Sequence, residues 1–268
     1  MIMNNKIVAV LLAASIPMTV FADSSIDPSD PTKIAAFAGP GFKFTSFADD
    51  SELVEIRASG NMGFGEKDMV LFELGYGNFD GAVISTDTTS GMTNARARWF
   101  HLFNMDGEVT RGYRGWATQV DLQLAGSVKG TTGSNTLAIG ALPAFAINND
   151  WDVYLPTSYV STWGEDFNKH LGHGISITPM FVYAPENGMW NQFFLQISPS
   201  YTRYFAGDIE NSGAGSIEFT TGGAVGERWI LTAVVTKNFD KNFEGFRRPG
   251  EASGANDWNV FFSGSYYF

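Results

Sequence analysis

Apolar residues recur at every second position along much of the chain. Between Val54 and Phe64, apolar side chains occupy most even positions and polar side chains most odd ones. A period of two predicts a β-strand with one apolar face and one polar face. The pattern returns in residues 68–79, 113–127 and 191–205. We therefore expect a protein built from two-faced strands.

Strand length separates a membrane barrel from a soluble sheet protein. Strands of soluble proteins usually have about 5–6 residues, whereas tilted strands of about 9–11 residues cross a bilayer. The predicted strands are residues 34–47, 52–64, 68–79, 93–104, 113–127, 136–147, 151–163, 174–183, 191–205, 215–225, 228–238 and 257–268. The predicted class is all-β: a single antiparallel transmembrane β-barrel of about 12 strands over residues 34–268.

The connections between these strands alternate in length. Those expected at the end that holds both termini are mostly short, and those at the other end are mostly longer. Residues 48–51 and 105–112 are exceptions, being short and long for their respective ends. Short turns at one end and long loops at the other are typical of outer-membrane barrels, with the turns in the periplasm.

The last predicted strand carries the most specific motif. Its alternating apolar residues end in an aromatic residue at the C-terminus: Trp258, Val260, Phe262, Tyr266 and Phe268. This segment resembles the terminal strand of bacterial outer-membrane β-barrels, although Gly264 replaces the usual apolar residue at the fifth position from the end. The resemblance implies recognition by the barrel-assembly machinery and a location in the outer membrane.

A narrower resemblance concerns small monomeric channels. In length, acidity and strand number the chain resembles nucleoside-specific channels and outer-membrane transporters encoded beside aromatic-degradation pathways. Residues 113–116 (YRGW), 119–123 (QVDLQ) and 237–241 (KNFDK) are similar to segments of the second group. The resemblance implies a small substrate-specific porin, and it assigns no binding residue and no solute.

The N-terminus is expected to direct export. Lys6 precedes an apolar stretch from Ile7 to Val20, and Val20-Phe21-Ala22 suits cleavage before Asp23. Residues 1–22 are therefore predicted to be a cleaved signal peptide, and 23–33 an N-terminal periplasmic segment. The alternative is an amphipathic helix that the mature protein retains.

Composition narrows the choice of class and partner. Only 17% of the residues are charged, against roughly 25% in soluble domains. Cleavage would leave 16 Lys and Arg against 28 Asp and Glu, a net charge of −12, which argues against nucleic acid as a partner because its binding depends on phosphate neutralisation. With no cysteine, no disulfide can stabilise the fold.

The polar faces of the strands are the candidate site. If the apolar faces contact lipid, polar and charged side chains of both signs line the lumen, and no strong ion preference is expected. The candidates are Lys43, Glu55, Arg57, Asn61, Glu73, Arg96, Arg98, Gln119, Asp121, Gln123, Gln196 and Glu218, together with Ser198 and Ser200. They form either the wall of a water-filled pore or a salt-bridge network that plugs a narrow barrel.

Three strands break this polar rule. Their inward positions are apolar: Tyr154, Val160, Met180, Val182, Ile230 and Val234. A lumen with one charged wall and one apolar wall favours an amphipathic or aromatic solute, unless the assumed register is wrong by one residue.

Pro143, Pro156 and Pro179 interrupt three consecutive strands, which predicts either bulges or a small lateral gap for a hydrophobic solute.

Catalytic and metal chemistry have little support. His173 and Ser176, with Glu165 or Asp166 nearby, are the only arrangement that could suit a barrel lipase or deacylase. His170 and His173 are the only pair spaced for a metal, and no third ligand is evident. No nucleophile-elbow, zinc-protease or nucleotide-binding motif occurs. We therefore expect no enzyme activity, no cofactor and no metal.

The long segment between the last two strands is a candidate gate. It contains aromatic and basic residues that could fold over the mouth or contact lipopolysaccharide: Phe243, Phe246, Arg247 and Arg248. Arg203, on an apolar face near the outer rim, is expected to reach lipid headgroups.

The expected function is passive diffusion of small amphipathic or aromatic solutes. The alternatives are a lipid hydrolase and a non-conducting structural or adhesion barrel.

Overall fold

The computed structural model describes residues 36–47, 50–81, 88–129, 131, 133–185, 193–239 and 256–268. Its strands are β1 (Phe37–Phe47), β2 (Glu52–Phe64), β3 (Asp68–Asp80), β4 (Ser90–Phe103), β5 (Gly112–Leu124), β6 (Ser134–Asn148), β7 (Trp151–Tyr154), β8 (Thr157–Gly164), β9 (His170–Ile177), β10 (Met180–Tyr183), β11 (Phe194–Gly207), β12 (Gly213–Val225), β13 (Trp229–Asn238) and β14 (Asn256–Tyr267). Within these ranges no helix is long and apolar enough to cross a membrane.

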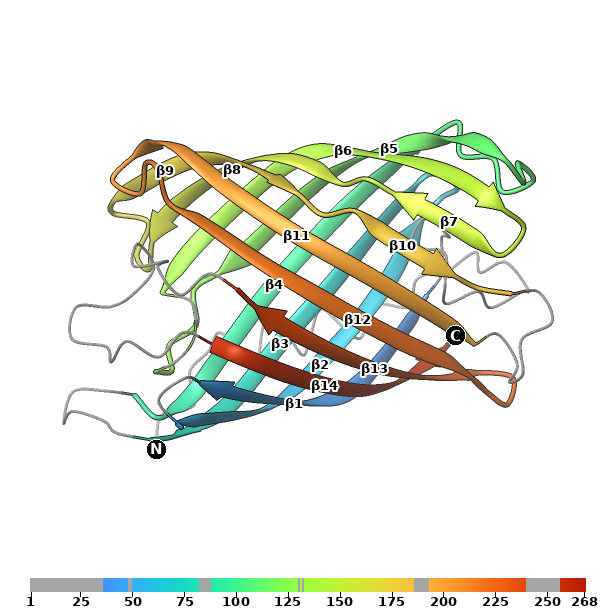
Figure 1. The fold of residues 1–268 in the computed structure, drawn as a ribbon. Coiled ribbons are helices and arrows are strands. Elements are labelled where there is room, and N and C mark those ends of the chain that lie inside the picture. The colour runs from blue at the N-terminus through green and yellow to red at the C-terminus, as the bar shows by residue number, and fades with distance from the viewer. Residues whose placement is uncertain are drawn as a thin grey trace.

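The strands form one closed antiparallel barrel (Figure 1). Neighbours in the sequence are mostly neighbours in the sheet, and β1 closes the ring by pairing with β14. Along that seam Phe37 lies opposite Tyr267, and Thr45 lies opposite Asn259. A closed sheet leaves no unpaired edge, as a strand barrel in lipid requires. The predicted all-β barrel is confirmed.

Two strands of the ring are broken in the middle. β7 and β8 both pair with β6, and β9 and β10 both pair with β11, so each couple forms the two halves of one strand. The breaks contain Pro156 and Pro179, which have no N–H to donate to the sheet. With each couple taken as one, the barrel has twelve strands, the number predicted.

The register continues unchanged across the breaks. Ala144 pairs with Tyr154 on one side of Pro156, and Ala141 pairs with Thr157 on the other. The proline carbonyls still accept hydrogen bonds, because the Thr178 N–H lies 3.0 Å from the Pro156 oxygen. The prolines therefore cause a local loss of pairing without a bulge.

The two faces of the wall follow the predicted alternation. Val54 and Ile56 of β2 are 51% and 58% exposed on the outside, whereas Glu55 between them is 2% exposed on the inside. Phe72, Leu74 and Tyr76 of β3 are likewise exposed. The outer face is therefore an apolar band, and the inner face carries the polar side chains.

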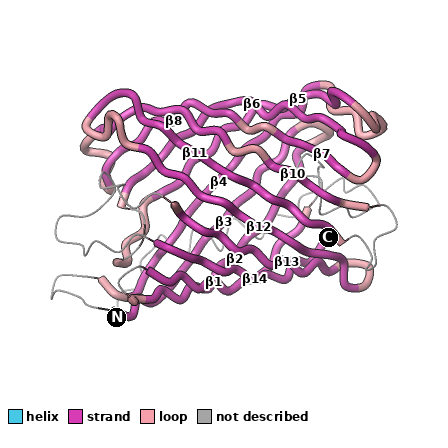
Figure 2. Tube along the Cα trace, viewed as in Figure 1, coloured by secondary structure: helices cyan, strands magenta, loops and turns pink. Residues whose placement is uncertain are grey.

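The two ends of the barrel differ. We call the end where β1 begins and β14 finishes the turn end, and the opposite end the loop end (Figure 2). Connections at the turn end are residues 65–67, 104–111, 149–150, 184–193 and 226–228, and those at the loop end are 48–51, 81–89, 125–133, 165–169, 208–212 and 239–255. Val128 and Ile209, from two loop-end connections, pack against inward side chains of the wall.

Candidate functional site

A continuous line of charged side chains crosses the inner wall from β1 to β5. We call these residues the charged wall: Lys43, Glu55, Arg57, Glu73, Arg96, Arg98 and Asp121. Each of the five strands contributes an inward position because the residues that flank it point outward. The structure therefore brings together seven residues that are as many as 78 positions apart in the sequence.

Glu55 organises the first half of the charged wall. Its carboxylate lies 3.3 Å from the Lys43 ammonium and 3.1 Å from the Arg57 guanidinium. Arg57 also pairs with Glu73 of the next strand at 3.2 Å. Because Glu55 is almost fully buried, the two cations are needed to offset the cost of removing its charge from water.

The second half of the charged wall repeats this alternation of sign. Arg98 pairs with Glu73 at 3.0 Å, so that Glu73 bridges two guanidinium groups. Arg96 binds Asp121 through two hydrogen bonds, one of them 2.9 Å long from Nε to Oδ1. Such two-point contacts fix both side chains in one orientation. The wall is therefore a positioned surface rather than a set of independent flexible charges.

Two neutral residues that sequence alternation did not identify complete the charged wall. The Thr93 hydroxyl donates to Glu55 at 2.6 Å, and the Asn94 amide donates to Glu73 at 3.3 Å. Both are buried because the register between β3 and β4 shifts at Gly75 and Tyr76, which places consecutive residues on the inside. The only sequence signal for this bulge is the glycine within the strand.

The opposite wall of the lumen is polar but mostly uncharged. Glu218 of β12 stands six strands from β4 in either direction around the ring. Ser200 and Ser216 share a 2.7 Å hydrogen bond. With Glu218 included, the predicted lumen residues comprise four cations and four carboxylates, and weak ion selectivity stays a prediction.

The remaining predicted lumen residues also lie on the inner face, in three separate places. Gln119 donates to Ser158 at 2.6 Å, which links β5 to β8. Gln196 donates to the hydroxyl of Ser198 at 2.8 Å on β11. Gln123 lies opposite Arg96 in the register of β4 and β5. These residues extend the polar surface beyond the charged wall.

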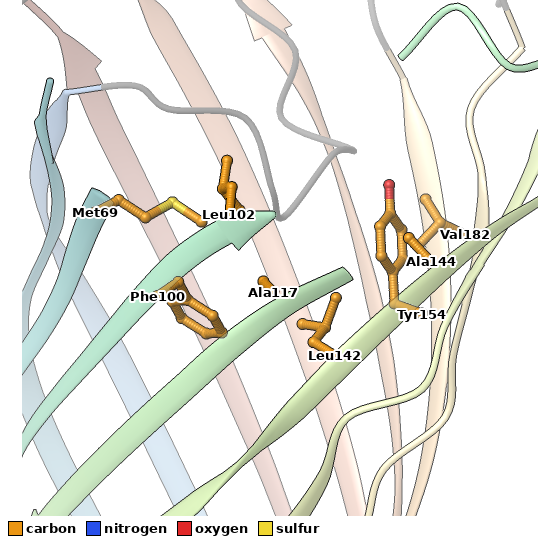
Figure 3. Close-up of a cluster of buried hydrophobic side chains, with 8 residues drawn as sticks. All are labelled: Met69, Phe100, Leu102, Ala117, Leu142, Ala144, Tyr154 and Val182. Carbon is orange, nitrogen blue, oxygen red and sulfur yellow. The ribbon is translucent and has the colours of Figure 1, made fainter. Parts of the chain in front are cut away.

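An apolar cluster lies on the inner face nearer the turn end than the charged wall does. Its buried members are Met69, Phe100, Leu102, Ala117, Leu142, Ala144, Tyr154 and Val182 (Figure 3). The predicted inward positions Tyr154 and Val182 are 1% and 2% exposed. Asn61, also predicted to line the lumen, borders the cluster, and its amide contacts the Met69 sulfur at 3.7 Å.

Val160 and Ile230 are also buried on the inner face. The register assumed for the apolar wall is therefore correct. The inside of the barrel therefore combines a charged wall with an apolar cluster.

The residues considered for catalysis are not brought together. His173 faces outward and contacts the Tyr159 hydroxyl at 2.6 Å, whereas Ser176 faces inward and accepts a 3.0 Å hydrogen bond from Thr202. Residues three apart in a strand point to opposite faces. The described part of the chain also holds no group of three or more His, Asp or Glu side chains placed to bind a metal ion.

The predicted gate residues Phe243, Phe246, Arg247 and Arg248 lie outside the described residues. The predicted signal peptide, residues 1–22, and the segment 23–33 lie outside them too.

Comparison with known proteins supports the fold at low sequence identity. No protein-family model and no curated protein sequence matches the chain. The COG4313 outer membrane channel from Pseudomonas putida F1 is similar in structure, with a TM-score of 0.58 and 10% identity over 91% of this chain and 100% of that one.

Two further solved structures show the same fold. The NanC porin has a TM-score of 0.52 and 8% identity, covering 87% of this chain and 100% of its own. The β domain of the Bordetella autotransporter BrkA has a TM-score of 0.50 and 11% identity, covering 87% and 99%. The chain therefore has the closed antiparallel β-barrel fold found in bacterial outer-membrane channels and porins.

Proposed function

We propose that the protein is a passive channel of the bacterial outer membrane for small amphipathic or aromatic solutes. The observation that carries the proposal is that two kinds of surface lie inside a barrel with an apolar outer face. The apolar cluster lies nearer the turn end than the charged wall does. The turn end, where three of the five connections have only two or three residues, would face the periplasm, as in outer-membrane barrels generally.

The charged wall would accommodate the polar part of a solute at low energetic cost. Its guanidinium and carboxylate groups are already paired and oriented, so a passing solute need not order them. Rings of charge in a water-filled lumen discriminate among solutes by charge and size. Because every cation of this wall is paired with a carboxylate, the wall favours hydrogen-bonding groups over a particular ionic charge.

The apolar cluster would accommodate the hydrocarbon or aromatic part of the same solute. Leu142, Tyr154 and Val182 pack together at the turn end with at most 2% of their surface exposed, so a passing solute would have to part these side chains to contact them (Figure 3). Contact with this surface removes apolar area from water, which is favourable by roughly 25 cal/mol per Å². A purely hydrophilic solute of the same size gains nothing there, so the cluster supplies the selectivity.

The proposal can be tested by uptake into liposomes that contain the purified protein. We expect a small aromatic alcohol to enter faster than a polyol of equal size, and the ratio of the two rates to fall in Val182→Thr. This change preserves shape and places a hydroxyl in the apolar cluster. Val54→Thr is the matched control, because the same change on the outer face of β2 leaves the lumen intact.

Two outcomes would count against the proposed solute class. Equal entry of the aromatic alcohol and the polyol would mean that the apolar cluster has no part in selection. No entry of either solute would favour the alternative in which the salt-bridge network plugs the barrel. Hydrolysis of membrane lipid by the purified protein, lost in His173→Ala or Ser176→Ala, would instead favour a barrel enzyme.

A further inference from the structure

A row of aromatic and imidazole rings follows the outer face near the loop end. Ring centroids are separated by 6.3 Å from Phe205 to Tyr159, 5.4 Å from Tyr159 to His173, 4.2 Å from His173 to His170, and 5.4 Å from His170 to Trp163. Aromatic rings of this kind form the girdle of a membrane barrel at the level of the headgroups. Two adjacent imidazoles in the middle of a girdle require a separate explanation.

Each imidazole is held by a hydroxyl through one nitrogen. The Tyr159 hydroxyl lies 2.6 Å from His173 Nδ1, and the Ser161 hydroxyl lies 2.9 Å from His170 Nε2. A hydroxyl that donates to one nitrogen leaves the proton of the neutral ring on the other. His173 Nε2 and His170 Nδ1, which bond to no other described residue, then become donors beside each other.

The turn end offers an internal comparison. There the rings of Trp99, His101, Phe103 and Trp116 form a similar outward row. The imidazole of this row has its own anion, because His101 Nδ1 lies 2.9 Å from the Asp68 carboxylate, which also accepts from Trp99 at 3.0 Å. His170 and His173 have hydroxyl partners in place of a carboxylate, so any anion that their free nitrogens bind would come from outside the described wall.

A guanidinium lies next to the loop-end row. Arg203 faces outward on β11, opposite Ile175 and two residues from Phe205. Its described contact is a 3.3 Å hydrogen bond to the neutral Asn211 side chain. Asp208, in the loop that follows β11, has its own partner in Lys169 at 2.5 Å.

The surface towards the middle of the barrel is apolar. Ile175 and Ile177 of β9 are each 47% exposed, and Tyr201 of β11 is 52% exposed. A headgroup held at the imidazoles and Arg203 would therefore have its acyl chains along this surface. Polar donors at the rim above apolar side chains match the chemistry of a phosphorylated lipid.

We propose that His170, His173 and Arg203 bind the phosphate of a lipid of the lipid A type in the outer leaflet. The phosphate would accept hydrogen bonds from the two imidazole nitrogens and from the guanidinium, the side chain best suited to phosphate geometry. This site rests on the proposed outer-membrane location, but it is independent of conduction because it lies on the outside of the barrel.

The test compares lipid binding by the purified full chain in detergent, measured by native mass spectrometry. The probes are lipid A with both phosphates and the same lipid without phosphate. We expect the phosphorylated lipid to bind at least about tenfold more tightly. We also expect the preference to disappear in His170→Gln/His173→Gln and to weaken in Arg203→Gln. His101→Gln, in the turn-end row, is the matched control and should bind as the unchanged protein does.

The outcomes separate this proposal from its competitors. Equal binding of the two lipids, or full binding by the double variant, would overturn the site. Millimolar inorganic phosphate that occupies the site while lipid A does not would assign it to the free anion. Mobility of the unheated protein on a gel shows that each variant forms the barrel, and Arg203→Gln provides a second test if the double variant does not. A double variant that keeps its conductance but loses lipid A binding would support both the channel and this site. An unchanged protein that binds lipid A but does not conduct would overturn the channel alone.

Discussion

Among single residues, Glu73 links the two halves of the charged wall. Its carboxylate joins Arg57 and Arg98, which come from the strands on either side, and it accepts a further hydrogen bond from Asn94. Removing that charge would leave two guanidinium groups facing the lumen without their shared partner. Selectivity should therefore be most sensitive at this position.

We expect Glu73→Gln to move the channel towards anions. A unit charge at about 4 Å contributes roughly 1 kcal/mol in water, which corresponds to about a fivefold change in the ratio of chloride to potassium permeability. The reversal potential in a potassium chloride gradient measures this ratio. Glu66→Gln is the control, because Glu66 is exposed in the turn between β2 and β3. An equal shift in both variants would show that Glu73 does not lie along the conduction path.

The sequence was sufficient to place the charged residues on the inner face, because period-two alternation assigns faces without knowledge of the partner strand. It could not predict which charges pair, since Arg57 with Glu73 and Arg96 with Asp121 depend on the register between strands. Thr93 and Asn94 were missed because a bulge overrides the alternation there. The imidazole pair was noted at its spacing, but its outward direction became clear only from the structure.

At the scale of elements, the seam between β1 and β14 has the closest backbone approach described at a glycine. A Cβ on Gly39 would lie 1.8 Å from the carbonyl oxygen of Gly264. Pro40 is the next residue of β1, and the pairing of β1 with β14 is assigned on both sides of this place but not at it. The glycine at position 264, unusual in a terminal strand, thus lies where the two strands crowd each other.

We expect Gly39→Ala to weaken closure of the barrel by roughly 1–3 kcal/mol, because the backbone must shift to admit the methyl group. The urea concentration at which the folded band disappears from an unheated gel would report the change. Gly215→Ala in β12 is the control, since its Cβ would come no closer than 3.6 Å to another atom. Equal stability of the two variants would contradict the crowding at the seam.

The proline breaks make a second weak element. Pro143, Pro156 and Pro179 lie on consecutive strands of the ring, and Pro199 of β11 lies between the residues that pair with β9 and with β10. The sequence predicted interruptions at the first three and left open whether they were bulges. The unchanged register shows missing hydrogen bonds instead.

We expect the amides of Leu155 and Thr178 to exchange hydrogen faster than those of β12, because each keeps one hydrogen bond to a proline carbonyl while the return bond from that proline is missing. Exchange is fast where backbone pairing is lost and slow in continuous strands. Peptide-resolved hydrogen exchange in detergent measures both regions in one sample, with residues 216–225 as the reference. Equal protection of the two regions would show that the breaks are closed in solution, and a lateral gap would lose its support.

At the scale of the whole molecule, the same alternation explains the near-zero mean hydropathy of −0.06. An apolar outer band and a polar inner wall cancel in the average, although each is well separated in space. Fold class, strand number and the direction of most side chains followed from this pattern. The identity of the solute did not follow from the pattern. Selectivity would depend on the apolar cluster and the charged wall together, and their positions along the barrel axis are known only once the strands are assembled.

Conductance of the purified protein in a planar lipid bilayer tests the central claim most directly. A barrel with a hydrated lumen should insert and produce discrete, reproducible current steps, with only weak preference between potassium and chloride because the lumen charges are balanced. Absence of current steps from protein that migrates as a folded barrel on an unheated gel, together with no solute uptake by liposomes, would contradict the account of a channel.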